Sequence, residues 1–182
     1  MSLTYLICRA HGYASRLLGR ELILELASTQ SLQQLVERLA ATEYSEKLKA
    51  ARTLMEMENA ITEVFLNRLR SLLKVAGESR GADFLKSYLR RYEVQNIIWI
   101  LRMRLGKASK EEASKLLIPI EEISDVKIED ILEAEDLTQA LEIIKRSKAY
   151  RLPKTINSLL ELETELWKNY YSRVFERTSR IP

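Results

Sequence analysis

The chain has 182 residues, of which 46% are hydrophobic and 30% are charged, and its formal net charge is +3. This composition is ordinary for a soluble globular protein, and the length suits one domain or two small ones. The single cysteine, Cys8, excludes an internal disulfide and fits a reducing cytoplasm. No apolar run approaches the roughly 20 residues that span a bilayer, and residues 1–9 lack the basic region of a signal peptide, so we expect neither feature.

Helix-forming residues dominate the sequence, and only 5 Gly and 3 Pro are present. Apolar residues recur at steps of three and four along nearly the whole chain, which is the spacing of one helix face. We therefore predict an all-α fold, a helical bundle with almost no strand.

Five helices are predicted in the first part of the chain. The longest has an apolar stripe that includes Leu54, Ile61 and Phe65, and Gly77 follows it where a helix end favours glycine. Ser31 is a predicted N-cap because its short side chain can accept from a free backbone N–H. The predicted ranges are 4–18, 21–27, 31–41, 44–51 and 53–76.

A second long helix is predicted over residues 83–105, with Asp83 as its N-cap and Gly106 at its end. Pro119 stops helix continuation, so residues 118–126 are predicted to form a loop. A final long helix is predicted to start near Pro153, since proline suits the first helical turn. Between them, shorter helices are predicted over 110–117, 128–132 and 136–146, the last with Asp136 as its N-cap.

An internal repeat appears when residues 32–70 are shifted by 105 positions onto 137–175 without a gap. Identical residues meet at several positions, including Leu54 with Leu159 and Arg68 with Arg173. The pattern indicates a duplicated unit of a short helix, a turn, a second short helix and a long helix; the alternative is coincidence between two amphipathic segments. We predict a first helical unit over 1–82 and a second, partial unit over 83–182, joined by the long helix 83–105.

Charge is distributed in blocks along the second half of the chain. Residues 85–110 hold seven Lys and Arg against one Glu, whereas residues 111–142 hold two against eleven Asp and Glu. Such blocks carry information about surfaces rather than about fold. They either face each other within the molecule or bind partners, and the sequence leaves both possibilities open.

No pattern in the sequence predicts catalysis, a cofactor or a metal ion. His11 is the only histidine, and Cys8 is the only soft ligand near it, so a metal site is not expected. Glu56 and Glu58 lie about 200° apart on a helix and cannot share one site, so we expect them to serve packing or salt bridges. The glycines form no phosphate-binding loop.

Four arginines on the basic helix are candidate partner-binding residues: Arg90, Arg91, Arg102 and Arg104. Basic helices with interleaved aromatic residues can bind nucleic acid, but a net charge of +3 is small for that class and the aromatic residues lie among apolar ones. Asn96 lies in the same apolar stretch. It is either buried, clamping a loop through its amide, or exposed on the polar edge of the helix.

Three stretches of the sequence resemble a known family. The longest, Tyr88-Leu-Arg-Arg-Tyr-Glu-Val-Gln-Asn-Ile-Ile-Trp-Ile-Leu-Arg102, is similar to the signature of the family formed by the C (or d) subunits of A/V-type ATPases, with Glu93 where Asp is usual. Residues 31–44, which end in Thr-Glu-Tyr44, and residues 117–119 also resemble family segments in the same order. The resemblance covers residues 5–175. It marks Glu93, Asn96 and Tyr44 as candidate structural polar residues.

What the resemblance implies is a mechanical role. Family members are about twice as long and consist of three related helical units arranged as a funnel, so this chain would cover one unit and part of a second. They are non-catalytic central-stalk subunits that link the rotor stalk to the membrane proteolipid c-ring. The implied partners are those other ATPase subunits, on the cytoplasmic side and peripheral to the membrane, with no nucleic acid. The alternative from the residues alone is an unrelated helical-repeat scaffold for a helical partner.

Overall fold

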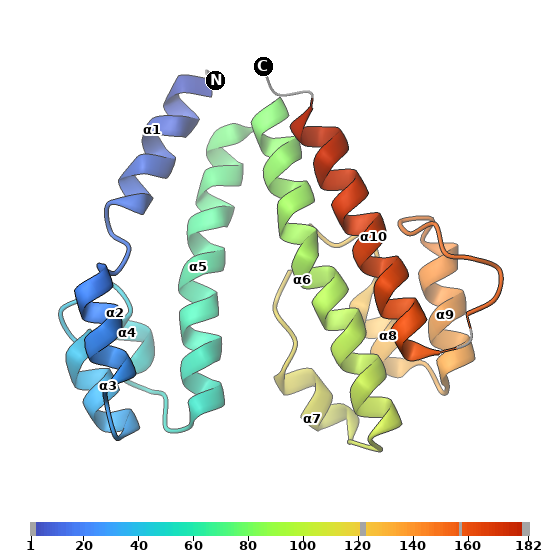
Figure 1. Ribbon diagram of the computed structural model, residues 1–182, viewed down its shortest axis with the longest axis horizontal. Coiled ribbons are helices and arrows are strands. Elements are labelled where there is room, and N and C mark those ends of the chain that lie inside the picture. Colours follow the sequence, from blue (N-terminus) through green and yellow to red (C-terminus); the bar gives the residue numbers. More distant parts are fainter. Residues whose placement is uncertain (1–2, 121–122, 157, 180–182) are drawn as a thin grey trace. The chain divides into compact units, whose positions relative to one another are not determined.

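The computed structural model describes residues 3–120, 123–156 and 158–179, and these residues form ten α-helices and no strand (Figure 1). The prediction of an all-α fold is confirmed. The chain divides into two compact units, Met1–Ala82 and Asp83–Pro182, called here the N-terminal and C-terminal units.

The N-terminal unit holds five helices around a small core. They are α1 (Leu3–Ala14), α2 (Arg20–Ala27), α3 (Leu32–Leu39), α4 (Ser45–Leu48) and α5 (Leu54–Ala76). In this unit α1 and α4 both contact the long helix α5 (Figure 1). Its core contains the buried side chains of Leu39, Leu48, Ala51 and Met57. Burial of these apolar side chains holds the short helices, which would be marginal alone, against α5.

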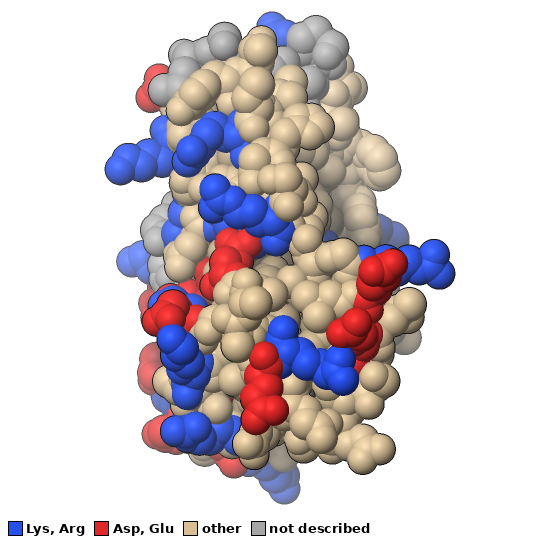
Figure 2. Space-filling view, turned by 90° about the vertical axis from the view of Figure 1, so that its left-hand side faces the viewer, with Lys and Arg blue, Asp and Glu red and all other residues tan. Residues whose placement is uncertain are grey.

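Charges of both signs lie side by side on the face that the N-terminal unit presents in Figure 2. Two of the exposed ion pairs within this unit join Arg38 to Glu25 at 2.9 Å and Lys47 to Glu63 at 2.6 Å. Exposed pairs of this kind contribute little stability, roughly 0–1 kcal/mol each.

The C-terminal unit is built around α6 (Arg80–Leu105), whose first residues belong to the N-terminal unit, and α10 (Leu159–Thr178). The shorter helices are α7 (Lys110–Lys115), α8 (Ile128–Glu133) and α9 (Leu137–Arg146). One apolar core joins α6, α8, α9 and α10, and its most buried members include Val94, Ile97, Ile131, Ile144 and Leu166.

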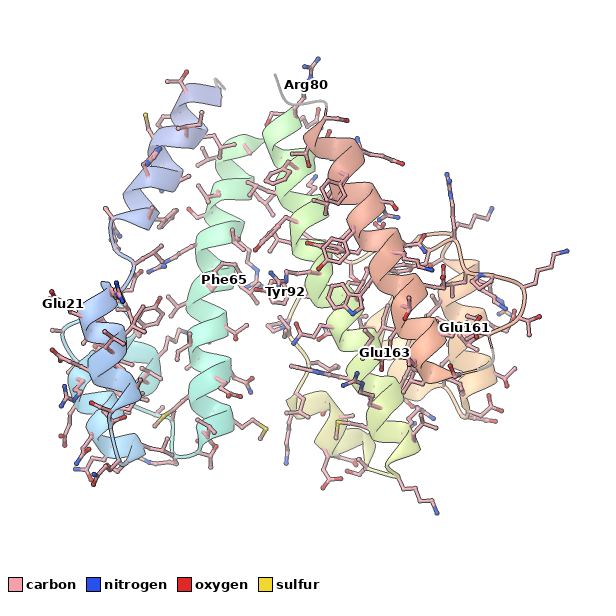
Figure 3. All side chains as sticks on the ribbon, in the orientation of Figure 1. Glu21, Phe65, Arg80, Tyr92, Glu161 and Glu163 are labelled. Atoms are coloured by element: carbon pink, nitrogen blue, oxygen red, sulfur yellow. The ribbon has the colours of Figure 1, made fainter. Side chains whose placement is uncertain are left out.

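The helices α6 and α10 run antiparallel. The last turn of α6 meets the first turns of α10 through Arg102 and Glu163, whereas the start of α6 meets the end of α10 through Asp83 and Arg177, whose charged atoms are 3.9 Å apart. Contacts at both ends show that the two helices pack along nearly their full lengths (Figure 3). The pair is the frame on which the other helices of the unit pack.

Two predicted helix starts are wrong. Helix α6 begins at Arg80 rather than at Asp83, because the hydroxyl of Ser79 accepts a hydrogen bond from the Ala82 backbone N–H at 3.2 Å. The last helix begins at Leu159 rather than near Pro153, because Ser158 caps it. Residues 151–156 are non-helical, and Asn169 accepts from the Arg151 N–H there at 2.8 Å. The other predicted helices also differ from the observed ones by one to four residues at one or both ends.

The internal repeat is present in the structure down to individual hydrogen bonds. Helices α3 and α9 begin 105 residues apart, as do α5 and α10. Three side-chain hydrogen bonds also recur at this offset. The N-cap bond Ser31–Gln34 matches Asp136–Gln139, and the N-cap bond Thr53–Glu56 matches Ser158–Glu161. In the turn, the hydroxyl-to-carbonyl bond Thr42–Leu39 matches Ser147–Ile144. Coincidence between two amphipathic segments does not explain matched caps and matched turns. The repeated helix–turn–helix–long-helix unit is therefore confirmed.

Lys148 has a positive φ of 57°, a backbone conformation that favours glycine. Its side chain is exposed, so removing that side chain costs no packing. We expect Lys148→Gly to stabilise the C-terminal unit by about 1 kcal/mol, because the left-handed conformation costs roughly that much for residues with a Cβ. Thermal unfolding measures the gain. Lys148→Ala keeps the Cβ, and an equal gain in that variant would contradict this explanation.

Candidate partner-binding surface

Arg102 is held by a carboxylate of the neighbouring long helix. Its Nε and Nη2 atoms each donate to Glu163 at 2.7 Å, the two-bond geometry that suits guanidinium and carboxylate. This hydrogen-bonded carboxylate raises the pKa of Arg102. Glu163 is nearly buried, although the Arg102 side chain is 60% exposed. Arg102 therefore joins α6 to α10 and also contributes to the outer surface.

Arg90 belongs to a small cluster of alternating charges. Its guanidinium pairs with Asp125, and Asp125 also accepts from Arg173 at 2.9 Å. Arg173 further donates to the carbonyl of Ala149. The cluster joins α6, α10 and the segments before α8 and after α9. Arg90 is thus engaged within the C-terminal unit.

Glu93 is fully buried and accepts four hydrogen bonds. Its Oε2 atom accepts from the Ser124 hydroxyl and from the backbone N–H groups of Asp125 and Val126, the last at 3.1 Å. Its Oε1 atom accepts from the Tyr150 hydroxyl. Burial, and then the charge of Glu93, raise the pKa of Tyr150 well above its usual range, so Tyr150 remains a donor at neutral pH. Buried polar groups need hydrogen-bond partners, and a carboxylate has enough lone pairs to accept from all four of these donors.

Asn96 lies one turn further along α6 and clamps Ile118, which lies between α7 and α8 like the residues that bond Oε2 of Glu93. Its Nδ2 donates to the Ile118 carbonyl at 2.8 Å, and its Oδ1 accepts from the Ile118 N–H at 2.9 Å. The residue is 1% exposed, so of the two alternatives left by the sequence the buried clamp is confirmed. Glu93 and Asn96 therefore fix the segment between α7 and α8 from its two ends, at Val126 and Ile118.

Arg104 lines a concave surface at the end of α6. Its Nη2 donates to the Leu132 carbonyl at 2.7 Å, which ties α6 to α8. The cavity beside it has a volume of about 420 Å³. Its apolar lining includes Ile100, Met103, Leu105, Ala108, Ala113 and Leu137.

Arg91 differs from the other three arginines because no carboxylate holds it within the described residues. Its guanidinium lies 5.7 Å from the ring centres of both Tyr88 and Tyr92 and donates to the Tyr88 hydroxyl at 3.2 Å. Arg91 is exposed. Of the four candidate partner-binding arginines, it is therefore the most available to another molecule, and its role there stays a prediction.

Tyr44, the remaining candidate structural residue, packs against the N-terminal core as the residue before α4. The guanidinium of Arg68 lies 5.6 Å from its ring centre, and Arg68 pairs with Glu43. This partly buried ion pair was not predicted. The only signal in the sequence was that arginine recurs in the repeat at positions 68 and 173, and Arg173 also pairs with a carboxylate, that of Asp125. Arg68 and Arg173 thus occupy matching positions in both sequence and structure.

Two kinds of feature are absent from the part of the chain that the structure describes. Within the described ranges, no three His, Cys, Asp or Glu side chains group in a way that could hold a metal ion. In the same part of the chain, no helix combines the length and apolar character needed to cross a bilayer.

Comparison with known proteins identifies relatives along nearly the whole sequence. Residues 6–182 match the family described as ATP synthase (C/AC39) subunit. The C subunit of the A-type ATP synthase of Thermococcus kodakarensis is 25% identical over 178 residues, which cover 94% of this chain and 47% of the relative. The C subunit of Pyrococcus horikoshii is 25% identical over 183 residues, covering 97% and 48%. That of Methanosarcina barkeri is 30% identical over 91 residues, covering 49% and 25%.

The chain thus spans about half the length of the first two of these relatives. The family match covers both units, including α6 with Glu93 and Asn96 and the repeated helices α5 and α10. Together with the all-helical fold, this match shows that the chain belongs to the ATP synthase (C/AC39) subunit family.

Proposed function

We propose that this protein is a non-catalytic subunit of the central stalk of an A/V-type rotary ATPase, on the cytoplasmic side and peripheral to the membrane. In this role it couples the rotor stalk to the proteolipid ring, so that ATP hydrolysis or synthesis is linked to ion transport. The family match over residues 6–182 is the observation that carries the proposal. Relatives named as the C subunits of A-type ATP synthases support it.

The construction of the C-terminal unit is consistent with mechanical coupling. A subunit that transmits torque must deform little under load, and close-packed interiors have low compressibility. Here α6 carries the Arg102–Glu163 pair, the four bonds of Glu93 and the two bonds of Asn96. These contacts fix α6 to α10 and to the segment between α7 and α8 at several points. Such cross-linking favours motion of the unit as one body.

Co-purification tests the proposal directly. The tagged chain, expressed with the central rotor subunits and the proteolipid ring of its own organism, should retain both on an affinity column. An unrelated helical protein of similar size and charge is the control. Failure to retain either partner at physiological salt would refute the proposed function.

Arg91→Glu should weaken retention of the partner without lowering the melting temperature, because Arg91 is exposed and held by no carboxylate within the described residues. Charge reversal on a docking surface typically acts through repulsion at the interface. We expect retention to fall by about tenfold, a loss of roughly 1.4 kcal/mol. Lys86→Glu, an exposed reversal on the same helix, is the matched control. Equal binding by wild type and Arg91→Glu would remove Arg91 from the interface.

A further inference from the structure

The repeat shows which side of its long helix each unit uses to bind another helix. On α10, Leu159, Glu163, Leu166 and Tyr170 follow steps of four, three and four, and so share one face. This face packs on α6: Glu163 binds Arg102, and the Tyr170 hydroxyl donates to the Tyr88 carbonyl at 3.3 Å. The Leu166 side chain is 0% exposed in this contact.

The corresponding face of α5 is exposed at its N-terminal end. Subtracting 105 from these positions gives Leu54, Glu58, Ile61 and Phe65, also on one face of one helix. Leu54 is 58% exposed and Ile61 is 39% exposed, and Glu58 is exposed as well. The face that binds a helix in the C-terminal unit is therefore exposed in the N-terminal unit at three positions, Leu54, Glu58 and Ile61, which include the same carboxylate.

The exposed face matches its covered counterpart in chemistry as well as in position. Leu54 corresponds to Leu159 and Ile61 to Leu166, so both faces offer aliphatic side chains on either side of the glutamate. Glu58 corresponds to Glu163, whose partner is an arginine. A helix that fits this face therefore needs an apolar stripe and an arginine opposite Glu58, since a guanidinium can bond a carboxylate through two parallel hydrogen bonds.

We propose that the N-terminal half of α5, marked by Leu54, Glu58 and Ile61, is a docking face for an α-helix of a partner protein. That helix presents an apolar stripe and an arginine, which pairs with Glu58 as Arg102 pairs with Glu163. The inference goes beyond the proposed function because it rests on the repeat within the chain.

A synthetic peptide of residues 83–105 is the probe, because α6 fits the corresponding face of α10. The labelled peptide, titrated with the full-length protein, should give a saturating rise in fluorescence anisotropy. In Glu58→Arg the affinity should fall by about tenfold, because like charges then face each other. A peptide with Arg102→Glu should restore binding to that variant. Lys74→Glu reverses an exposed charge on the opposite side of α5 and should leave binding unchanged.

The outcomes separate this proposal from the proposed function. Absence of peptide binding, or equal affinity for wild type and Glu58→Arg, would overturn the docking face even if the chain still co-purified with ATPase subunits. Restored binding only in the charge-swapped pair supports it even if co-purification fails. Glu58 is exposed, so we expect Glu58→Arg to fold, and circular dichroism checks its helix content.

Discussion

Replacing Glu93 with Gln should destabilise the C-terminal unit by about 3 kcal/mol or more, because hydrogen bonds to a charged group contribute about 1.5–3 kcal/mol each. Glu93 accepts four such bonds at a position with no exposure to water. An amide offers one acceptor oxygen, and its NH₂ group would face N–H and O–H donors that need an acceptor. Domains are stable by only about 5–15 kcal/mol, so the expected loss is a large fraction.

Urea unfolding followed by tryptophan fluorescence measures this loss for the C-terminal unit alone. The chain has 2 Trp, Trp99 and Trp167, and both lie in that unit. Glu129→Gln removes an exposed glutamate on α8 and is the matched control, with an expected change within about 0.5 kcal/mol. If both variants shifted the urea midpoint equally, the four hydrogen bonds of Glu93 would not be a major source of stability.

Leu166→Ala should cost about 2–5 kcal/mol, the range for truncating a fully buried leucine. Leu166 is 0% exposed, and the cavity left behind would lie in the core between α6 and α10. The repeat supplies an internal comparison, because Ile61 occupies the corresponding position in α5 and is 39% exposed. Ile61→Ala should therefore cost the isolated chain much less, about 1 kcal/mol.

The two truncations need different probes. Tryptophan fluorescence reports Leu166→Ala, whereas the N-terminal unit contains no tryptophan, so circular dichroism at 222 nm follows Ile61→Ala. Similar costs for the two variants would show that Ile61 is buried in solution. That result would also remove the exposed face on which the α5 docking proposal rests.

Local signals in the sequence predicted the helices and several of their ends. Ser31 and Asp136 were predicted N-caps, and each accepts the expected hydrogen bond in the structure. The predicted start of the last helix failed because distant contacts override the local signal. Pro153 suits a helix start, but Tyr150 is buried and Asn169 bonds the Arg151 backbone, so residues 151–156 are non-helical and the helix is capped by Ser158.

The role of the basic helix could be predicted only in part. The residues and their charge were readable, but the partners of Arg90 and Arg102 lie 35 and 61 residues away in sequence, beyond any helical period. The four donors to Glu93 could not be predicted for the same reason, because they also lie far from it in the sequence. Of the two alternatives for the charge blocks, the structure shows contacts within the molecule: Arg90 pairs with Asp125, and Lys110 pairs with Glu133. Binding of these surfaces to partners stays a prediction.

The matched helix caps of the two units have a consequence for how duplicated units diverge. Ser31 and Asp136 occupy equivalent positions of the two repeats, as do Thr53 and Ser158. Although the residue types differ, each side chain accepts from the backbone N–H three residues later. Any short side chain with an acceptor oxygen satisfies this geometry. Two units that descend from a common ancestor can therefore keep the same positions of hydrogen-bond acceptors after most of their residues have been substituted. Kinship between such units is better sought in bonding pattern than in percentage identity.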